Sequence, residues 1–283
     1  MQEILQIWRQ SEEYAAISSA VRAVKTASLS GLPPAAKAAL AAALYGELRR
    51  PALILTAHED EARFIYENIR PFLGGQALYF PVMELLPFEV YARNIEITAE
   101  RIAALSALSR GEVPLVVASV SAIQRRLPPP SLFAKEHIAL KPGTIIQPVE
   151  LAAKLADMGY EKYKLTEIPG SFSLRGSIVD IFPLTALSPC RLEFFDDELE
   201  SIRYFDPASQ LSAELCEKLL ITPARELPLT AEARLRAAQA LNQEMTGTAP
   251  LLSVPAQKQL REAFNPLREY LDQGFVSIRI SQN

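Results

Sequence analysis

The chain has 283 residues, of which 49% are hydrophobic and 22% charged, and its formal net charge is −4. These values are ordinary for a folded protein and exclude a disordered, collagen-like or coiled-coil chain. The 29 Lys and Arg against 33 Asp and Glu also exclude a surface that is basic throughout, although a local basic patch could still bind nucleic acid.

Few residues are available for metal or disulfide chemistry. Cys190 and Cys216 cannot build a disulfide framework or a four-thiolate zinc site, and His58 and His137 add little to them. No apolar run reaches the roughly 18 residues that span a bilayer, and the N-terminus lacks the features of a secretory signal. We therefore expect a cytoplasmic protein with no metal site, no cofactor of its own and no membrane partner.

Residues 1–127 predict an α/β domain with a parallel sheet. A leading helical segment (1–26) is followed by an Ala/Leu-rich helix that starts at Pro33-Pro34. Helices are also predicted over residues 59–73 and from Thr98 to a stop at Gly111. The apolar runs at residues 51–57 and 114–120 are typical of strands buried on both faces, and residues 77–81 are also strand-like. Alternating strands and helices favour a parallel sheet with helices on both of its faces.

The pattern changes at Pro128-Pro129-Pro130, which cannot continue a helix or lie in a central strand. We place a domain boundary there and predict an inserted α+β domain over residues 128–222, with a helix that ends at Gly159. Its predicted strands are residues 137–143, 163–168, 171–176, 177–183, 190–196 and 199–206. Residues 223–283 return to helix, and we expect them to pack against residues 1–127 and complete the first domain.

The segment GLPPAAKA comes close to the P-loop pattern G-x-x-x-x-G-K-[ST]. Gly31 and Lys37 match, but Ala36 replaces the second glycine and Ala38 replaces the hydroxyl that coordinates Mg²⁺. Pro33-Pro34 removes two more N–H donors from the loop. Two interpretations stay open: an ordinary helix with a chance spacing, or a P-loop fold that has lost its nucleotide site. Both predict that this chain does not hydrolyse ATP.

The most specific motif is SFSLRGSIVDIFPLTALSPCRLEFFDDELESIRYFDPASQ (171–210). It contains an R-G-x-x-[VIL]-D-[IL]-F-P core, then a strand pair around Asp196-Asp197, then F-D-x-x-[ST]-Q. This stretch resembles the N-terminal module of the bacterial transcription-repair coupling factors (Mfd), which is similar to the excinuclease subunit UvrB. The incomplete P-loop, the segment Thr98–Ile102 and ITPARE (221–226) extend the resemblance to roughly residues 20–230.

This resemblance implies a fold, a function and partners. The fold would be a UvrB-like, degenerate P-loop α/β domain with an inserted α+β domain. The inserted domain would bind UvrA and recruit it to stalled RNA polymerase for nucleotide excision repair, so the chain would be a docking module and not an enzyme. RNA polymerase, DNA, ATP and Mg²⁺ would be bound by other parts of a longer ATP-dependent DNA translocase, of which this chain is expected to be a fragment.

The resemblance also selects residues for the UvrA-binding surface. Arg175, the motif arginine, is the first candidate and Phe182 the second, because arginine and aromatic side chains are frequent anchors in interfaces. Gly176 lies in the motif turn between them. Arg175 could instead form an ion pair inside the fold with Asp180 or Glu193, and Phe182 could equally belong to the core.

One position departs from the family pattern. Family members commonly have a basic residue after Gly159-Tyr160 that helps to bind UvrA, whereas this chain has Glu161 followed by Lys162. Lys162 could replace that basic residue. A lysine is a point charge without the bidentate fork of arginine, so the affinity need not be the same.

The basic pairs Arg49-Arg50 and Arg125-Arg126 are more typical of solvated helix ends than of a DNA-binding patch. UvrB clamps DNA with an aromatic-rich hairpin, and the corresponding residues 82–97 contain Phe88 and Tyr91 but are not rich in tyrosine. We expect weak or absent DNA binding. A UvrB-like ATPase or helicase lobe and a DNA-binding module remain alternative functions.

Overall fold

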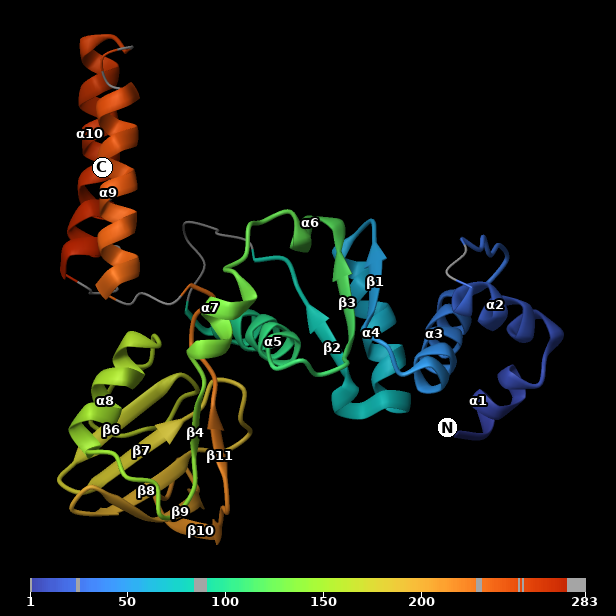
Figure 1. Cartoon of the computed structure of the whole chain (residues 1–283), viewed down its shortest axis with the longest axis horizontal. Coiled ribbons are helices and arrows are strands. Elements are labelled where there is room, and N and C mark those ends of the chain that lie inside the picture. The colour runs from blue at the N-terminus through green and yellow to red at the C-terminus, as the bar shows by residue number, and fades with distance from the viewer. Residues whose placement is uncertain are drawn as a thin grey trace.

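A computed structural model describes residues 2–23, 26–83, 91–227, 231–248, 250 and 252–273 of the chain. Within them the fold is mixed α/β, with one parallel sheet and further sheets (Figure 1). We call the first part the parallel-sheet unit. Its elements are α1 (Gln2–Arg9), α2 (Glu12–Arg22), α3 (Pro34–Leu48), β1 (Ala52–Thr56), α4 (Glu59–Leu73), the 3₁₀ helix η1 (Gly74–Gln76), β2 (Ala77–Phe80), α5 (Tyr91–Ser109), β3 (Leu115–Ser119) and α6 (Val120–Ile123).

The second part is a strand-rich module, which we call the six-stranded module after its main sheet. Its elements are β4 (Ile138–Leu140), α8 (Pro148–Asp157), β5 (Glu161–Lys162), β6 (Ser171–Arg175), β7 (Ile178–Phe182), β8 (Cys190–Phe195), β9 (Glu198–Phe205), β10 (Ser212–Leu215) and β11 (Leu219–Ile221). Helix α7 (Pro130–Lys135) connects the two parts, and helices α9 (Ala231–Thr248) and α10 (Val254–Gln273) follow the module.

The parallel-sheet unit has the strand order β1-β3-β2, and both strand pairs are parallel, as the alternating pattern predicted. Helices α3 and α4 pack on one face, where Tyr45 and Ile65 meet Val117 in a buried cluster. Helix α5 lies against β2 on the other face. The prediction that residues 51–57 form a strand buried on both faces is wrong, because β1 is an edge strand that α5 does not cover. Leu53 and Leu55 are consequently 57% and 46% exposed.

Two predicted helix boundaries also differ from the structure. The single leading segment over residues 1–26 is two helices, because the hydroxyl of Ser11 accepts a hydrogen bond from the amide of Tyr14 (3.1 Å) and caps a new helix there. Helix α5 begins at Tyr91 and not at Thr98, so part of the stretch predicted as a connection is helical.

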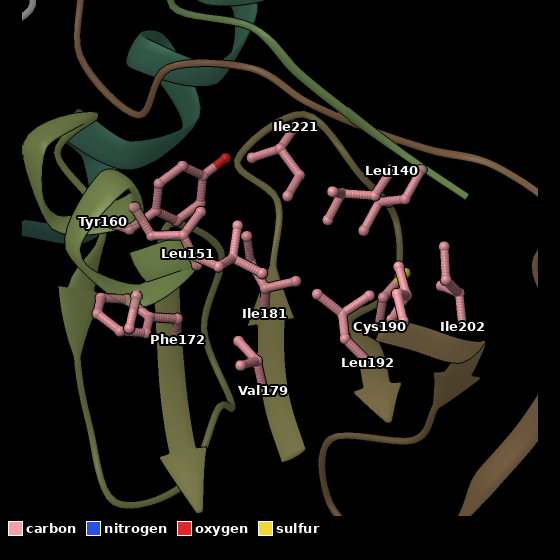
Figure 2. Packing of buried hydrophobic residues seen from close by; sticks show 14 of the residues in the cluster. Leu140, Leu151, Tyr160, Phe172, Val179, Ile181, Cys190, Leu192, Ile202 and Ile221 are labelled. Carbon is pink, nitrogen blue, oxygen red and sulfur yellow. The ribbon is translucent and has the colours of Figure 1, made fainter. Parts of the chain in front are cut away.

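The main sheet of the six-stranded module has the order β10-β9-β8-β7-β6-β5, antiparallel except for the β5–β6 pair. One face packs against α8. Figure 2 shows Val179, Ile181 and Leu192 on the same side of the sheet as Leu151 of α8, and all four side chains are fully buried. Among the described residues, α8 is the helix that packs on this sheet, and we call the opposite face the open face.

Five of the six strands predicted in this module are present, although β4 covers only part of its predicted range. Residues 163–168 were predicted as a strand and are not one, because the chain pairs with β6 only at Glu161 and Lys162 and then leaves the sheet edge. Strand β10 was not predicted, since all four of its residues are exposed and give no apolar alternation.

The chain enters and leaves the six-stranded module side by side, because β4 pairs antiparallel with β11. Helices were predicted for residues 223–283, and α9 and α10 are helices that pack against each other. Their hairpin stands apart from the parallel sheet (Figure 1), whereas we expected these residues to pack against residues 1–127. Two helices with apolar faces can cover each other without the sheet. The domain boundaries stay predictions.

Candidate protein-docking site

The hairpin of β6 and β7 places Arg175, the arginine of the R-G motif, beside the turn between these strands. Arg175 ends β6 and pairs with Ile178, the first residue of β7. Gly176 begins the turn between them with φ +60°, in the left-handed region that favours glycine, and no atom lies within 4 Å of where a Cβ would be. The motif R-G therefore combines an exposed arginine with the residue that makes the turn.

Strand register gathers charged residues on the open face of the sheet. Asp180 pairs with Ser173 on β6 and with Arg191 on β8, and Arg191 pairs with Arg203 on β9. Because side chains alternate along a strand, these residues point away from the core that α8 covers. The register thus brings arginines from three strands, Arg175 included, to the face on which Asp180 lies.

Asp180 is the centre of this face. Its carboxylate is fully buried and accepts two hydrogen bonds from Arg191, from Nε at 2.7 Å and from Nη2 at 3.0 Å. It also accepts one from Nη2 of Arg175. We call these three residues the Asp180 cluster. The bidentate Arg191 pair fixes the carboxylate, and Arg175 joins it from the side.

The two arginines of the Asp180 cluster differ in exposure. The side chain of Arg191 is 14% exposed, stacks on the ring of Phe205 with 4.9 Å from Cζ to the ring centroid, and donates to the carbonyl of Gln210 at 3.2 Å. The hydrogen bonds with Asp180 raise the pKa of Arg191. Arg175 is 46% exposed. Arg191 is therefore structural, while Arg175 is anchored at one end and leaves the rest of its guanidinium exposed.

A second charged group lies beside the cluster. Glu193 accepts a hydrogen bond from the hydroxyl of Ser201 (2.5 Å), and Nε of Arg203 lies 3.8 Å from its carboxylate. Phe195, two residues further along β8, is 72% exposed. An arginine and an aromatic ring on the same open face are the side chains that most often anchor protein interfaces.

The structure separates the two leading sequence candidates. Arg175 does form the ion pair with Asp180 that we considered, and it stays half exposed, so the two interpretations of this residue are compatible. Phe182 is 8% exposed and offers a partner little surface. Its assignment to the UvrA-binding surface stays a prediction that this burial does not favour.

Glu161 and Lys162 lie on opposite faces at the sheet edge. Glu161 pairs with Ser171 and so shares the face of Arg175, whereas Lys162 pairs with Phe172, whose ring is in the core on the other face. The carboxylate of Glu161 accepts a hydrogen bond from the hydroxyl of Tyr163 (2.8 Å), and Lys162 is exposed. In this register, Lys162 does not extend the row of arginines.

The segment GLPPAAKA forms the start of α3. Gly31 has φ +78°, and Pro33 and Pro34 begin the helix without donors for an anion. Ala38 is fully buried in the core under α4, and Nζ of Lys37 lies 4.0 Å from the carboxylate of Glu61. A P-loop follows a strand. Residues 26–33, which lead directly into α3, contain no strand.

A carboxylate of the chain itself occupies the carboxyl ends of β2 and β3. Glu59 accepts hydrogen bonds from the hydroxyl of Tyr79 (2.6 Å), the amide of Val82 (2.9 Å) and the hydroxyl of Ser119. Burial, and then the bond to Glu59, raise the pKa of Tyr79 and keep it a donor. Open α/β sheets bind ligands at this edge, and a carboxylate there disfavours a phosphate by charge repulsion.

One arginine of each basic pair considered for DNA makes a contact inside the chain. Arg49 is the C-cap of α3 with φ 48°, and its guanidinium lies 3.5 Å from the side-chain oxygen of Gln76. Arg125 lies 3.5 Å from the carbonyl of Met83. Phe88 and the side chain of Tyr91, the aromatic residues noted in the clamp region, lie outside the described residues.

No metal centre is evident in the part of the chain that the structure describes, where no three His, Cys, Asp or Glu residues gather to hold an ion. In the same residues no helix is long and apolar enough to cross a membrane.

Sequence reasoning missed two arginines. Arg191 stands in the motif strand CRLEFF, and its register opposite Asp180 was the signal that could have identified it. Arg101 was noted only as part of a family pattern, yet its side chain is fully buried and paired with Glu226. A buried arginine in a helix gives no signal in sequence periodicity until its distant partner is known.

Known proteins similar to this chain are transcription-repair coupling factors, and one family of domains matches its strand-rich part. Residues 138–227 match the family of the UvrB interaction domain. A transcription-repair coupling factor of Bacillus subtilis is 32% identical over 265 residues, which are 93% of this chain and 22% of that relative. One from Myxococcus xanthus is 34% identical over 271 residues, also 93% and 22%. One from Staphylococcus aureus is 29% identical over 241 residues, 85% and 20%.

The chain thus spans about a fifth of the length of the curated relatives it matches. The matched domain contains the whole main sheet and the Asp180 cluster. Residues 138–227 are therefore similar to the UvrB interaction domain family, and the chain is similar to part of the transcription-repair coupling factors, as the motif at residues 171–210 predicted.

Proposed function

We propose that this chain is a non-catalytic docking module that binds UvrA through the open face of the six-stranded module. In a longer protein it would recruit UvrA to stalled RNA polymerase for nucleotide excision repair. The parent would be a cytoplasmic, ATP-dependent DNA translocase whose motor, with its ATP and Mg²⁺, and whose contacts to RNA polymerase and DNA lie in other parts. The parallel-sheet unit would be a degenerate P-loop domain into which the six-stranded module is inserted.

The observation that carries this proposal is the Asp180 cluster within a UvrB interaction domain. Arg175 is held by Asp180 and remains 46% exposed, so its guanidinium is positioned before a partner arrives. Positioning a side chain in advance lowers the entropy that binding would otherwise lose. The free N–H groups of Arg175 suit a carboxylate or a backbone carbonyl of the partner.

Calorimetric titration of the chain with UvrA tests the proposal. Arg175→Ala should weaken binding by about 1–3 kcal/mol if Arg175 is an anchor. The fold should survive, because Arg191 alone still holds Asp180 in a bidentate pair. Arg175→Lys should lose most of the same energy, since an ammonium cannot make the forked contact.

The matched control is Arg110→Ala, which removes an exposed arginine paired with Glu112 on the parallel-sheet unit and should leave the affinity unchanged. No binding of UvrA by the unmodified chain would refute the proposal. An unchanged affinity of the folded Arg175→Ala variant would remove Arg175 from the surface.

Two alternatives make different predictions. A UvrB-like ATPase or helicase lobe would bind ATP with Mg²⁺, while buried Ala38 and the carboxylate of Glu59 favour no binding. A DNA-binding module would bind duplex DNA in a salt-sensitive way, against the net charge of −4. Micromolar affinity in either titration would replace docking as the proposed function.

A further inference from the structure

We propose that the segment Thr222–Glu226, which leaves the six-stranded module, locks that module onto helix α5, with Arg101 as the latch. The two parts of the molecule then move as one body. We call this segment the exit segment. This inference concerns mechanics inside the chain and does not depend on which partner binds the open sheet face.

Arg101 holds the exit segment from the side of the parallel-sheet unit. Its guanidinium donates two hydrogen bonds to the carboxylate of Glu226, from Nε and from Nη2 (3.2 Å). Nη1 donates to the carbonyl of Pro81 at 2.6 Å, and Cζ lies 3.9 Å from the centre of the Phe80 ring. The side chain of Arg101 is 0% exposed and that of Glu226 16%. Pro81 and Phe80 fix the guanidinium on the sheet side, and Glu226 is the contact that crosses to the module.

The exit segment also makes contacts with the six-stranded module. The amide of Ala224 donates to the carbonyl of Met158 (2.9 Å), and the hydroxyl of Tyr160 donates to the carbonyl of Thr222 (2.8 Å). Arg225 packs on Gly159, where a Cβ would lie 2.1 Å from its Nε. Gly159 is thus required for this close approach as well as for its φ of +98°. Thr222, Ala224 and Arg225 therefore contact the module, and Glu226 contacts α5.

A buried apolar cluster supports the latch. Ile102 of α5 meets Phe133 of α7 and Leu184, which follows β7. The amide of Leu184 also donates to the hydroxyl of Tyr160 at 3.3 Å. Strand β7, which carries Asp180, therefore runs directly into the contact between the two parts. A force applied at the Asp180 cluster would reach α5 through packed side chains and not through a flexible linker.

Removing the carboxylate of the Arg101–Glu226 pair tests the latch directly. A buried arginine without its carboxylate keeps an unpaired charge in a place that water does not reach. Glu226→Ala should therefore release the exit segment from α5, while the bonds of Thr222 and Ala224 keep it on the module. The two parts would then become free to change their mutual orientation.

Distance measurements between spin labels test this in the full chain. One label replaces exposed Glu67 on α4 and the other replaces exposed Leu187 in the six-stranded module, and both native cysteines are buried. The otherwise unchanged chain should give one narrow distance distribution. Glu226→Ala should at least double its width, and Glu217→Ala, which removes an exposed carboxylate of the module, should leave it unchanged. An unchanged width in Glu226→Ala overturns the proposal.

Amide hydrogen exchange in the unmodified chain keeps the proposal testable if Glu226→Ala does not fold. The Ala224 amide should exchange as slowly as the amide of Ile181 in the core strand β7. Exchange as fast as in an unstructured peptide would overturn the proposal without any substitution.

Discussion

The two larger sheets of the molecule present contrasting surfaces. On the parallel sheet, the edge strand β1 exposes two apolar side chains, Leu53 and Leu55. On the six-stranded sheet, the open face carries charge, with Arg175 and Arg203 beside carboxylates. Apolar surface is attracted to any apolar surface, whereas paired charges accept only a partner that satisfies them. Specific recognition is therefore expected on the charged sheet.

The same two regions use a hydrogen-bonded carboxylate in different ways: Glu59 is partly buried, whereas Asp180 is fully buried. Glu59 accepts hydrogen bonds from neutral groups of its own unit, including Tyr79 and Ser119, and occupies the edge where a ligand would bind. Asp180 receives its side-chain bonds from two arginines and holds one of them at the surface. Glu59 fills the edge where a ligand would bind, whereas Asp180 positions an exposed arginine. This difference is expected if the module docks a partner and does not catalyse a reaction.

The largest effect should follow removal of the carboxylate that organises the charged sheet. Asp180→Ala leaves the largely buried guanidinium of Arg191 unpaired and should cost about 3–5 kcal/mol of unfolding free energy. Urea unfolding, with amide exchange of β7 to locate the loss, measures it. Glu150→Ala, which removes an exposed pair with Lys154, is the control and should cost less than about 0.5 kcal/mol. A loss under about 1 kcal/mol for Asp180→Ala would mean that the cluster does not hold the sheet.

A pair of leucines tests the contrast within the parallel sheet. Leu115 on β3 is 1% exposed, and Leu115→Ala should cost about 2–5 kcal/mol through lost burial and a cavity. Leu53 on neighbouring β1 is 57% exposed, and Leu53→Ala should change stability by about 0.5 kcal/mol or less. Thermal unfolding of both variants compares them directly. Equal losses would mean that the β1 face is covered in solution.

Much of this fold follows from local sequence pattern. The apolar runs gave β1, β2 and β3, and the motif strands β6 to β9 were found because apolar residues such as Val179 and Ile181 alternate with polar ones. Strand β10 has no buried face, and the chain at 163–168 leaves the sheet edge, so pattern alone could not place either. Exposure of β1 depends on where α5 packs, which is a tertiary fact.

The candidate site was predicted only as far as its motif. The sequence identified Arg175 and offered Asp180 as a possible partner, and both lie together. It did not identify Arg191, whose partner Asp180 is known only once the register of β7 and β8 is known. It also did not identify the pairing of Arg101 with Glu226, which are 125 positions apart in sequence. Pairing across strands and between units depends on register and packing, which a linear motif does not encode.

The smallest effect concerns a carboxylate that is partly exposed, in contrast to Asp180. Glu47 of α3 accepts hydrogen bonds from Tyr14, Arg22 and Ser18 of α2, which together lower its pKa to about 2. A carboxylate with a lowered pKa in the folded state stabilises above its ordinary pKa and loses this contribution as the pH falls toward the folded value. Because the side chain is 27% exposed, solvent screening reduces the contribution to about 1 kcal/mol at pH 7.

Glu47→Gln measures that contribution. Thermal unfolding of both chains between pH 7 and pH 2 should give a difference that is full at neutral pH and shrinks below about pH 5, because protonation of Glu47 removes the charge that Arg22 and the two hydroxyls stabilise. A difference that stays constant down to pH 2.5, about two pH units below the ordinary pKa of a glutamate, would contradict the charged role of Glu47. Apolar packing alone would then hold α2 on α3. Glu47 would differ from Asp180, whose charge organises the six-stranded module.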